Sequence, residues 1–286
     1  MAGPIPSVRS NEGVTVPAMI YGTAWKREHT AELVELALQA GFRGIDTACQ
    51  PKHYHEAGVG EGLSRWLGNG VGRESVYLQS KFTPLDGQDP ARLPYDASLP
   101  LAQQITQSFR VSLQNLRTDY LDSLLLHSPL QPFTRMIDGW EAMESLYLSG
   151  GVRQLGISNC YNLALLQALY DVARIKPAVV QNRFYAETGF DQPLRAWCRE
   201  RGIIYQSFWT LTANRHLLGT LSVGRLAEKY HCEPAQILLR YVTQQDIVPL
   251  TGTSSPEHMH DDLKIFDFRL NREELETVEC ALLAGS

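Results

Sequence analysis

The sequence has few features of secreted, membrane or nucleic-acid-binding proteins. Its five cysteines are odd in number, scattered and without a CxxC pair, which is typical of reduced thiols inside a cell. No apolar run approaches the roughly 20 residues that span a bilayer, and the first residues lack a basic-then-apolar signal. The net charge of −5 gives no reason to expect nucleic acid. We therefore expect a cytoplasmic protein that binds neither nucleic acid nor membrane.

The chain also lacks the GxGxxG fingerprint and any recognisable linker. Instead, apolar runs of strand length alternate with helical patterns. The runs cover eight ranges, 16–24, 42–48, 76–82, 123–129, 152–159, 178–185, 203–210 and 247–253. Eight such units predict a closed parallel (β/α)₈ barrel, an α/β TIM barrel, with one domain over residues 1–286. A doubly wound open sheet stays the alternative, because strand order cannot be deduced from sequence.

Three charged or titratable residues interrupt or end these apolar strands. Asp46 ends the second, Lys81 the third and His127 the fourth. In a (β/α)₈ barrel the chemistry gathers at the carboxyl ends of the strands. Because Asp and Lys are almost never fully buried alone, we expect Asp46 and Lys81 to form an ion pair. Such a pair could be structural and simply close the barrel.

A functional interpretation of the pair involves Tyr54, in the loop after the second strand. A neighbouring ammonium lowers the pKa of a phenol, so Lys81 would make Tyr54 a better proton donor, and Asp46 would keep Lys81 charged. His127 could then hydrogen-bond a substrate oxygen. This arrangement suits protonation of a carbonyl oxygen as hydride reaches the carbonyl carbon.

Further polar and aromatic residues fall at the predicted mouth. They are Thr23 and Trp25 after the first strand, Ser158, Asn159 and Gln181 on the fifth and sixth, Gln206, Ser207 and Trp209 on the seventh, and Thr251, Thr253, Ser254 and Ser255 after the eighth. Trp25 and Trp209 could line an apolar substrate pocket.

These residues lie in motifs that carry a resemblance. "GTAW", "GFRGIDTACQPKHYHEAGVGEGL", "LQSKF", "LLLHSP", "VRQLGISN", "VVQNRFY" and "PLTGTSSPEHMHDDLKIFDFRL" resemble the aldo-keto reductase family from end to end, and "DTACQPKHY" is most similar to fungal members. The resemblance implies a barrel that uses NADPH without a metal. It also implies a tetrad of Asp46, Tyr54, Lys81 and His127, with Tyr54 as general acid. Ser158, Asn159 and Gln181 match the positions that hold the nicotinamide carboxamide.

The sequence departs from the family pattern at three places. Asp46 and Tyr54 are eight residues apart, farther than usual. Gln206 stands where an aromatic ring usually stacks on nicotinamide. Either Gln206 packs there without stacking, or the ring comes from Trp209 or Tyr205.

The third departure concerns the cofactor phosphates. The segment after the eighth strand lacks a fixed cation. Its phosphate-binding candidates are the hydroxyls of Thr251, Thr253, Ser254 and Ser255 and the following helix N-terminus, with His258 in place of arginine and Asp262 beside it. NADPH is expected, and NADH is the alternative cofactor.

Other interpretations receive less support. The HxH of His53 and His55 lacks further metal ligands at strand ends, "GVGEG" at 58–62 lies on a helix pattern that favours close packing, and Cys49 has no evident base. A nicotinamide-binding sensor or regulatory subunit without turnover is the alternative function. The last helix runs to the end of the chain, so we expect an open mouth that admits bulky aldehydes or ketones. We expect a monomer and leave the substrate open.

Overall fold

The computed structural model describes residues 5–68 and 70–284. Eight parallel strands close into one barrel in the order β10-β3-β4-β5-β6-β7-β8-β9. The strands are β3 (Ile20–Gly22), β4 (Gly44–Asp46), β5 (Tyr77–Phe82), β6 (Ser123–Leu126), β7 (Leu155–Ser158), β8 (Val179–Arg183), β9 (Ile204–Phe208) and β10 (Ile247–Thr251). Pairing of β10 with β3 closes the ring. The predicted (β/α)₈ barrel is confirmed, and the open doubly wound sheet is wrong.

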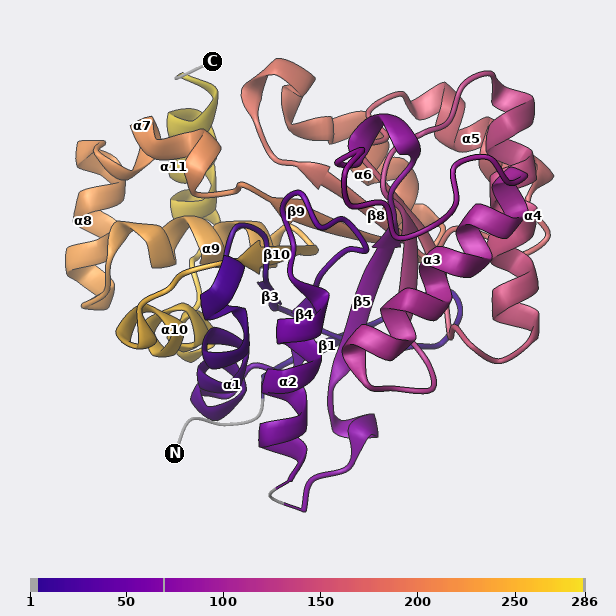
Figure 1. The fold of residues 1–286 in the computed structure, drawn as a ribbon. Helices are drawn as coiled ribbons and strands as arrows, with labels where there is room; N and C mark the ends of the chain where they lie inside the picture. The colour runs from indigo at the N-terminus through magenta and orange to yellow at the C-terminus, as the bar shows by residue number, and fades with distance from the viewer. Residues whose placement is uncertain (1–4, 69, 285–286) are drawn as a thin grey trace.

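Helices cover the outside of the barrel, as Figure 1 shows. They are α1 (Thr30–Ala40), α2 (Glu56–Leu67), α3 (Leu101–Leu116), α4 (Phe133–Leu148), α5 (Leu163–Val172), α6 (Gln192–Glu200), α7 (Arg215–Leu218), α8 (Leu221–Tyr230), α9 (Pro234–Gln244), α10 (Pro256–Leu263) and α11 (Arg272–Leu283). A large apolar core lies between barrel and helices. Among the described residues, no helix is long and apolar enough to cross a membrane.

The amino end of the barrel is covered by a short hairpin, β1 (Ser7–Arg9) and β2 (Thr15–Pro17). Val16 packs there with Ile20 and Val248 in a small apolar cluster. The sequence predicted one strand over 16–24, whereas the chain forms β2, a break and then β3. Pro17 ends the first piece because proline has no N–H to donate to a ladder.

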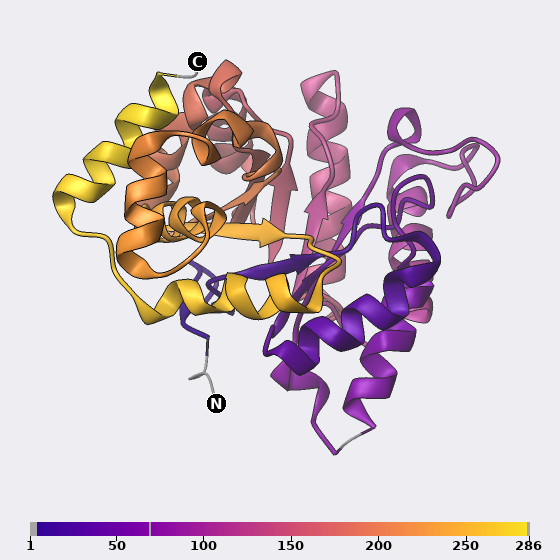
Figure 2. The same cartoon turned by 90° about the vertical axis from the view of Figure 1, so that its left-hand side faces the viewer.

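The long loop predicted at 84–100 connects β5 to α3 and holds one short 3₁₀ turn, Leu85–Gly87. In Figure 2 it projects on the side toward which the arrows of β3 and β10 point. The loop is anchored at its root, since the Tyr95 hydroxyl donates to the Thr83 carbonyl over 2.9 Å. Gln88 Nε2 also donates to the Cys49 carbonyl over 2.9 Å. These bonds tie the loop to the segments that follow the neighbouring strands β4 and β5.

Two glycines of "GVGEG" let α2 approach its neighbours closely, which confirms the packing interpretation of this segment. A Cβ on Gly60 would lie 2.0 Å from the Asn115 carbonyl oxygen at the end of α3. A Cβ on Gly62 would lie 2.5 Å from the Ala31 carbonyl oxygen of α1. Both obstacles are backbone atoms, so a side chain there forces the helices apart.

We expect Gly60→Ala to lower the free energy of unfolding by about 1–3 kcal/mol, the usual cost of overpacking a core. Urea denaturation measures it. The matched control is Gly224→Ala in α8, where a new Cβ meets nothing within 4 Å. That change should raise stability by up to about 1 kcal/mol, because alanine is the better helix former. Equal effects of the two substitutions would contradict the packing argument.

Candidate active site

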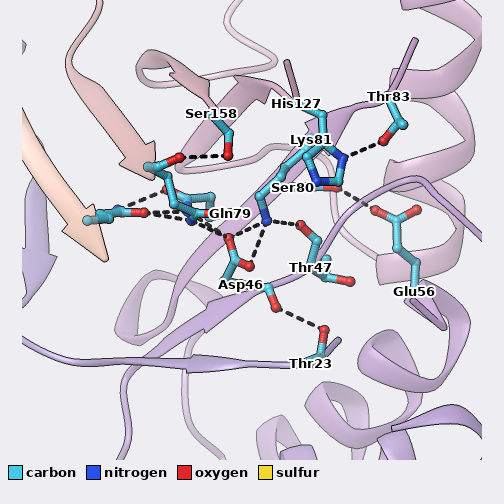
Figure 3. Close-up of polar contacts among 12 residues, drawn as sticks. Thr23, Asp46, Thr47, Glu56, Gln79, Ser80, Lys81, Thr83, His127 and Ser158 are labelled. Carbon is cyan, nitrogen blue, oxygen red and sulfur yellow. Dashed lines mark hydrogen bonds and ion pairs between the residues drawn. The ribbon is translucent and has the colours of Figure 1, made fainter. Parts of the chain in front are cut away.

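The carboxyl ends of β4 and β5 bring one buried ion pair together, as Figure 3 shows. Lys81 Nζ lies 2.7 and 2.6 Å from the two carboxylate oxygens of Asp46 and 2.9 Å from the Thr47 carbonyl oxygen. Lys81 is 0% exposed and Asp46 is 2% exposed. An ammonium has three protons, and these three acceptors use all of them. Burial lowers the pKa of Lys81, and Asp46 opposes that shift.

Three glutamine amides surround the carboxylate inside the barrel. Gln79 Nε2 and Gln181 Nε2 donate to Asp46 Oδ1 over 2.7 and 3.0 Å. Gln206 connects the two, because its Oε1 accepts from both amides and its Nε2 donates back to Gln79 Oε1. The Tyr77 hydroxyl donates to Gln79 Oε1 over 2.8 Å. These donors replace the water that a buried carboxylate loses.

Tyr54 reaches the site despite its long spacing from Asp46. The chain continues to pair with β5 beyond Asp46, since Cys49 N–H donates to the Lys81 carbonyl over 3.1 Å. It then turns, and Tyr54 N–H donates to the Gln50 carbonyl over 3.0 Å. This turn places the ring with its centroid 5.3 Å from Lys81 Nζ.

The electrostatics of Tyr54 differ from the sequence-based expectation. Lys81 was expected to lower the pKa of the phenol. Instead, burial raises it and the Asp46 carboxylate raises it further. The reason lies in the geometry, because the phenol is fully enclosed and the Asp46 carboxylate acts on it as well as the Lys81 ammonium. The phenol therefore stays protonated at neutral pH.

His127 follows β6 and is oriented by Thr83, a residue that the sequence analysis missed. Thr83 Oγ1 lies 2.6 Å from His127 Nδ1. The centroids of the His127 and Tyr54 rings are 6.1 Å apart. Burial and the nearby Lys81 charge hold the pKa of His127 well below its ordinary value, so the imidazole is neutral at neutral pH.

These groups meet at one cavity of about 1270 Å³. It extends from the Tyr54 and His127 side to α9 and α10. The sequence-predicted residues in its lining are Trp25, Asp46, Tyr54, His127, Ser158, Asn159, Gln181, Trp209, Thr251, Thr253, His258 and Asp262. The predicted residues outside the lining are Thr23, Lys81, Gln206, Ser207, Ser254 and Ser255.

The sequence profile of the Aldo/keto reductase family matches residues 18–282. The chain belongs to this family. It is 31% identical over 276 residues to glyoxal reductase of Bacillus subtilis, across 96% of this chain and 91% of the relative. It is 28% identical to morphine 6-dehydrogenase of Pseudomonas putida, across 98% and 92% of the two chains. The fold matches a Bombyx mori aldo-keto reductase in complex with NADP at a TM-score of 0.81, with 25% identity over 98% and 94% of the two chains.

The family prediction is thereby confirmed, but the expected likeness to fungal members is not borne out. The two relatives named above are bacterial, and a further one is from Gallus gallus. The motif "DTACQPKHY" is therefore no guide to the source of this aldo/keto reductase.

The residues expected at the nicotinamide lie at the end of β7 and in the middle of β8. Ser158 Oγ donates to the Gln181 carbonyl over 2.7 Å. Asn159 has a left-handed backbone, with φ of 55°, and its Nδ2 donates to the His127 carbonyl over 2.8 Å. Gln181 uses its Nε2 on Asp46 and Gln206. Its Oε1 accepts no hydrogen bond from the described residues.

Several predicted cofactor residues have structural partners instead. Gln206 is committed to the glutamine cluster inside the barrel, so it does not offer a surface for stacking. The Tyr205 hydroxyl donates to Asp191 away from the cavity. Of the three candidates for stacking, only Trp209 lines the cavity.

Ser207 and Thr23 are also fully buried. The Ser207 hydroxyl pairs with Thr210 over 2.8 Å. Thr23 Oγ1 donates to the Asp46 carbonyl over 2.9 Å and so fixes the backbone of the ion pair.

The loop after β10 meets a cation that the sequence analysis overlooked. Lys26 Nζ donates to the Gly252 carbonyl and lies 3.4 Å from Ser254 Oγ. Burial lowers the pKa of Lys26. Ser255 caps α10 by accepting from His258 N–H. A signal was present in "GTAWK", because the lysine lies in the loop that follows the first barrel strand.

Asp262 lies on the same side, where its Oδ2 accepts from Thr251 Oγ1 over 2.6 Å. Burial raises the pKa of Asp262 to about 6. In the HxH segment, the His53 ring packs on Trp25 with centroids 4.1 Å apart. Across residues 5–68 and 70–284, no three His, Cys, Asp or Glu side chains are grouped to hold a metal ion. Burial raises the pKa of Cys49, which keeps it a thiol.

Removing one partner of the ion pair should strongly destabilise the protein. Asp46→Asn leaves the Lys81 ammonium buried without a counter-charge, and we expect the free energy of unfolding to fall by about 3–5 kcal/mol. Urea denaturation measures the loss. The control is the double variant Asp46→Asn/Lys81→Met, which should regain most of the stability because no charge stays buried. Equal losses in the single and double variants would contradict this account.

The low pKa of His127 predicts a pH dependence of stability. The unfolded chain binds a proton near pH 6.5, whereas the native imidazole does not. Stability therefore falls as pH drops below 6.5, with a slope of up to about 1.4 kcal/mol per pH unit from this group. We expect the pH dependence of the unfolding free energy to be shallower in His127→Gln over this range. Identical slopes would show that His127 titrates normally.

Proposed function

We propose that this aldo/keto reductase reduces an aldehyde or ketone to the alcohol with NADPH, and that Tyr54 donates the proton. The observation that carries the proposal is the convergence of the Tyr54 phenol and the His127 imidazole on one cavity, above the buried Asp46–Lys81 pair. When bound, the reduced nicotinamide supplies hydride to the carbonyl carbon.

In the proposed mechanism, each side chain has a separate role in the proton transfer. Thr83 Oγ1 lies 2.6 Å from His127 Nδ1, and in the proposed mechanism this nitrogen accepts the hydrogen bond, so that Nε2–H is left to hold the carbonyl oxygen. Tyr54, kept protonated by burial and by Asp46, donates its proton to that oxygen. The resulting phenolate is stabilised by the Lys81 ammonium nearby, and water returns the proton.

The lining of the cavity fits a nicotinamide dinucleotide. Gln181 Oε1 is unused and can accept from the carboxamide, together with Ser158 and Asn159. Trp209 offers the face of its indole that the Arg183 guanidinium does not cover. The volume of about 1270 Å³ exceeds the roughly 300–1,000 Å³ of common ligand pockets, so it suits a dinucleotide together with a bulky carbonyl substrate.

Lys26 and the hydroxyls of Thr253, Ser254 and Ser255 are candidates for the phosphates, with Thr251 and His258 beside them. NADPH is favoured by the NADP complex of the Bombyx mori relative. NADH is a possible second cofactor, because the carboxyl group of Asp262 lies at this end of the cavity. The free cysteines of the described chain support a reducing compartment, and we propose a cytoplasmic monomer.

The decisive variant is Tyr54→Phe. We expect NADPH oxidation with aldehydes, followed by absorbance, to fall about 10²–10⁴-fold because the general acid is lost, while NADPH binding by fluorescence persists. The control is Tyr230→Phe, whose hydroxyl binds Glu274 outside the cavity, and it should keep wild-type turnover. A Tyr54→Phe variant that retains activity would overturn the role of Tyr54. A wild type that binds NADPH but reduces nothing favours the sensor or regulatory function.

A further inference from the structure

The cavity contains a cation that the proposed mechanism does not use. Arg183 is the last residue of β8 and lines the same cavity as Tyr54 and His127. Side chains alternate along a strand, so Arg183 faces the same side as Gln181. Two residues at about 3.3 Å each place it roughly 7 Å nearer the mouth. Because Gln181 contacts Asp46, Arg183 lies one layer above the proton-transfer groups.

Arg183 has no acidic partner among the described residues. Its guanidinium lies 4.3 Å over the Trp209 ring and 5.1 Å over the Tyr185 ring. Its Nε is buried and makes no hydrogen bond. By contrast, Arg73, also largely buried, binds the Asp122 carboxylate over 2.9 Å.

The acidic residues of the cavity do not neutralise Arg183. Asp46 is taken by Lys81. Glu233, Asp261 and Asp262 belong to the α9 and α10 side, away from the end of β8. A guanidinium with unmet donors in a partly desolvated pocket is a strong site for an anion, because it binds a carboxylate through two parallel hydrogen bonds.

Two exposed indoles define the apolar part of the same mouth. Trp209 is 47% exposed and Trp25 is 56% exposed, and both line the cavity. Trp209 is stacked against Arg183 and so restricts where the guanidinium can point. An anion held by Arg183 would therefore lie beside an aromatic surface and above the reacting carbonyl.

On the basis of the proposed function, we propose that Arg183 binds a carboxylate of the carbonyl substrate. The substrate class is then an aldehyde or keto acid whose carboxylate and carbonyl are joined by an apolar, preferably aromatic, spacer. Arg183 selects the substrate, and Tyr54 and His127 act on its carbonyl.

The test compares substrates that differ only in charge. 4-Carboxybenzaldehyde is paired with methyl 4-formylbenzoate, and the 3-substituted acid with its methyl ester. The readout is the ratio of kcat/KM for acid over ester, with NADPH. We expect the wild type to prefer the acid in at least one pair, and Arg183→Gln to lower that ratio about ten- to hundredfold, the range for a hydrogen bond to a charged group. The loss should appear mainly in KM.

Two control variants separate specificity from general damage. Arg110→Gln removes one positive charge from the exposed surface of α3 and should leave the ratio unchanged. Arg183→Lys keeps the positive charge but loses the planar guanidinium that makes two parallel hydrogen bonds. Its acid-over-ester ratio should therefore lie between those of the wild type and Arg183→Gln. Thermal unfolding and NADPH binding confirm that each variant is intact.

The outcomes distinguish this inference from the proposed function. If the wild type reduces both members of each pair and Arg183→Gln leaves the ratios unchanged, the carboxylate site is wrong and the reductase function stands. If no carbonyl compound is reduced although NADPH binds, the proposed function itself fails and the inference falls with it.

Discussion

Two opposite charges buried inside a barrel lose their hydrogen bonds to water. Each of their protons and lone pairs then needs a hydrogen-bond partner from the protein. The Asp46–Lys81 pair meets this demand with the Thr47 carbonyl on one side and the Gln79 and Gln181 amides on the other. Each partner comes from a different stretch of the ring, so the barrel must close in one register for the pair to be satisfied. The ion pair is thus a constraint on the whole fold as well as part of the site.

The same constraint explains the polar interior of this barrel. Such interiors are usually filled by branched apolar side chains, yet here Gln79 and Gln206 form a reciprocal amide pair at full burial. Both polar atoms of the Gln206 amide are thereby engaged inside the barrel. A position that family resemblance assigned to nicotinamide stacking instead supports the Asp46 carboxylate through its neighbours.

Sequence reasoning predicted the barrel because strands buried on both faces form continuous apolar runs, and a charged residue in such a run stands out. Asp46, Lys81 and His127 were found this way. Thr83, Gln79 and Lys26 were not, because their importance depends on lateral register and on which loop crosses the mouth. Neither property produces a recognisable pattern in the local sequence. The direction of the Tyr54 pKa shift was mispredicted for a related reason, since the sequence does not show that the phenol is buried or that the Asp46 carboxylate acts on it alongside Lys81.

The side chains of the site lie in successive layers along the barrel axis. The neutral glutamine cluster supports the ion pair, the Tyr54 phenol and His127 imidazole face the cavity, and Arg183 with Trp209 lies at the mouth. Gln181 and Arg183 are two residues apart on β8, so one strand contributes to two successive layers. A change at Arg183 leaves every hydrogen bond of the Asp46–Lys81 pair in place. Under the proposed function, substrate selection can therefore vary at the mouth while Tyr54 and His127 beneath it keep their geometry.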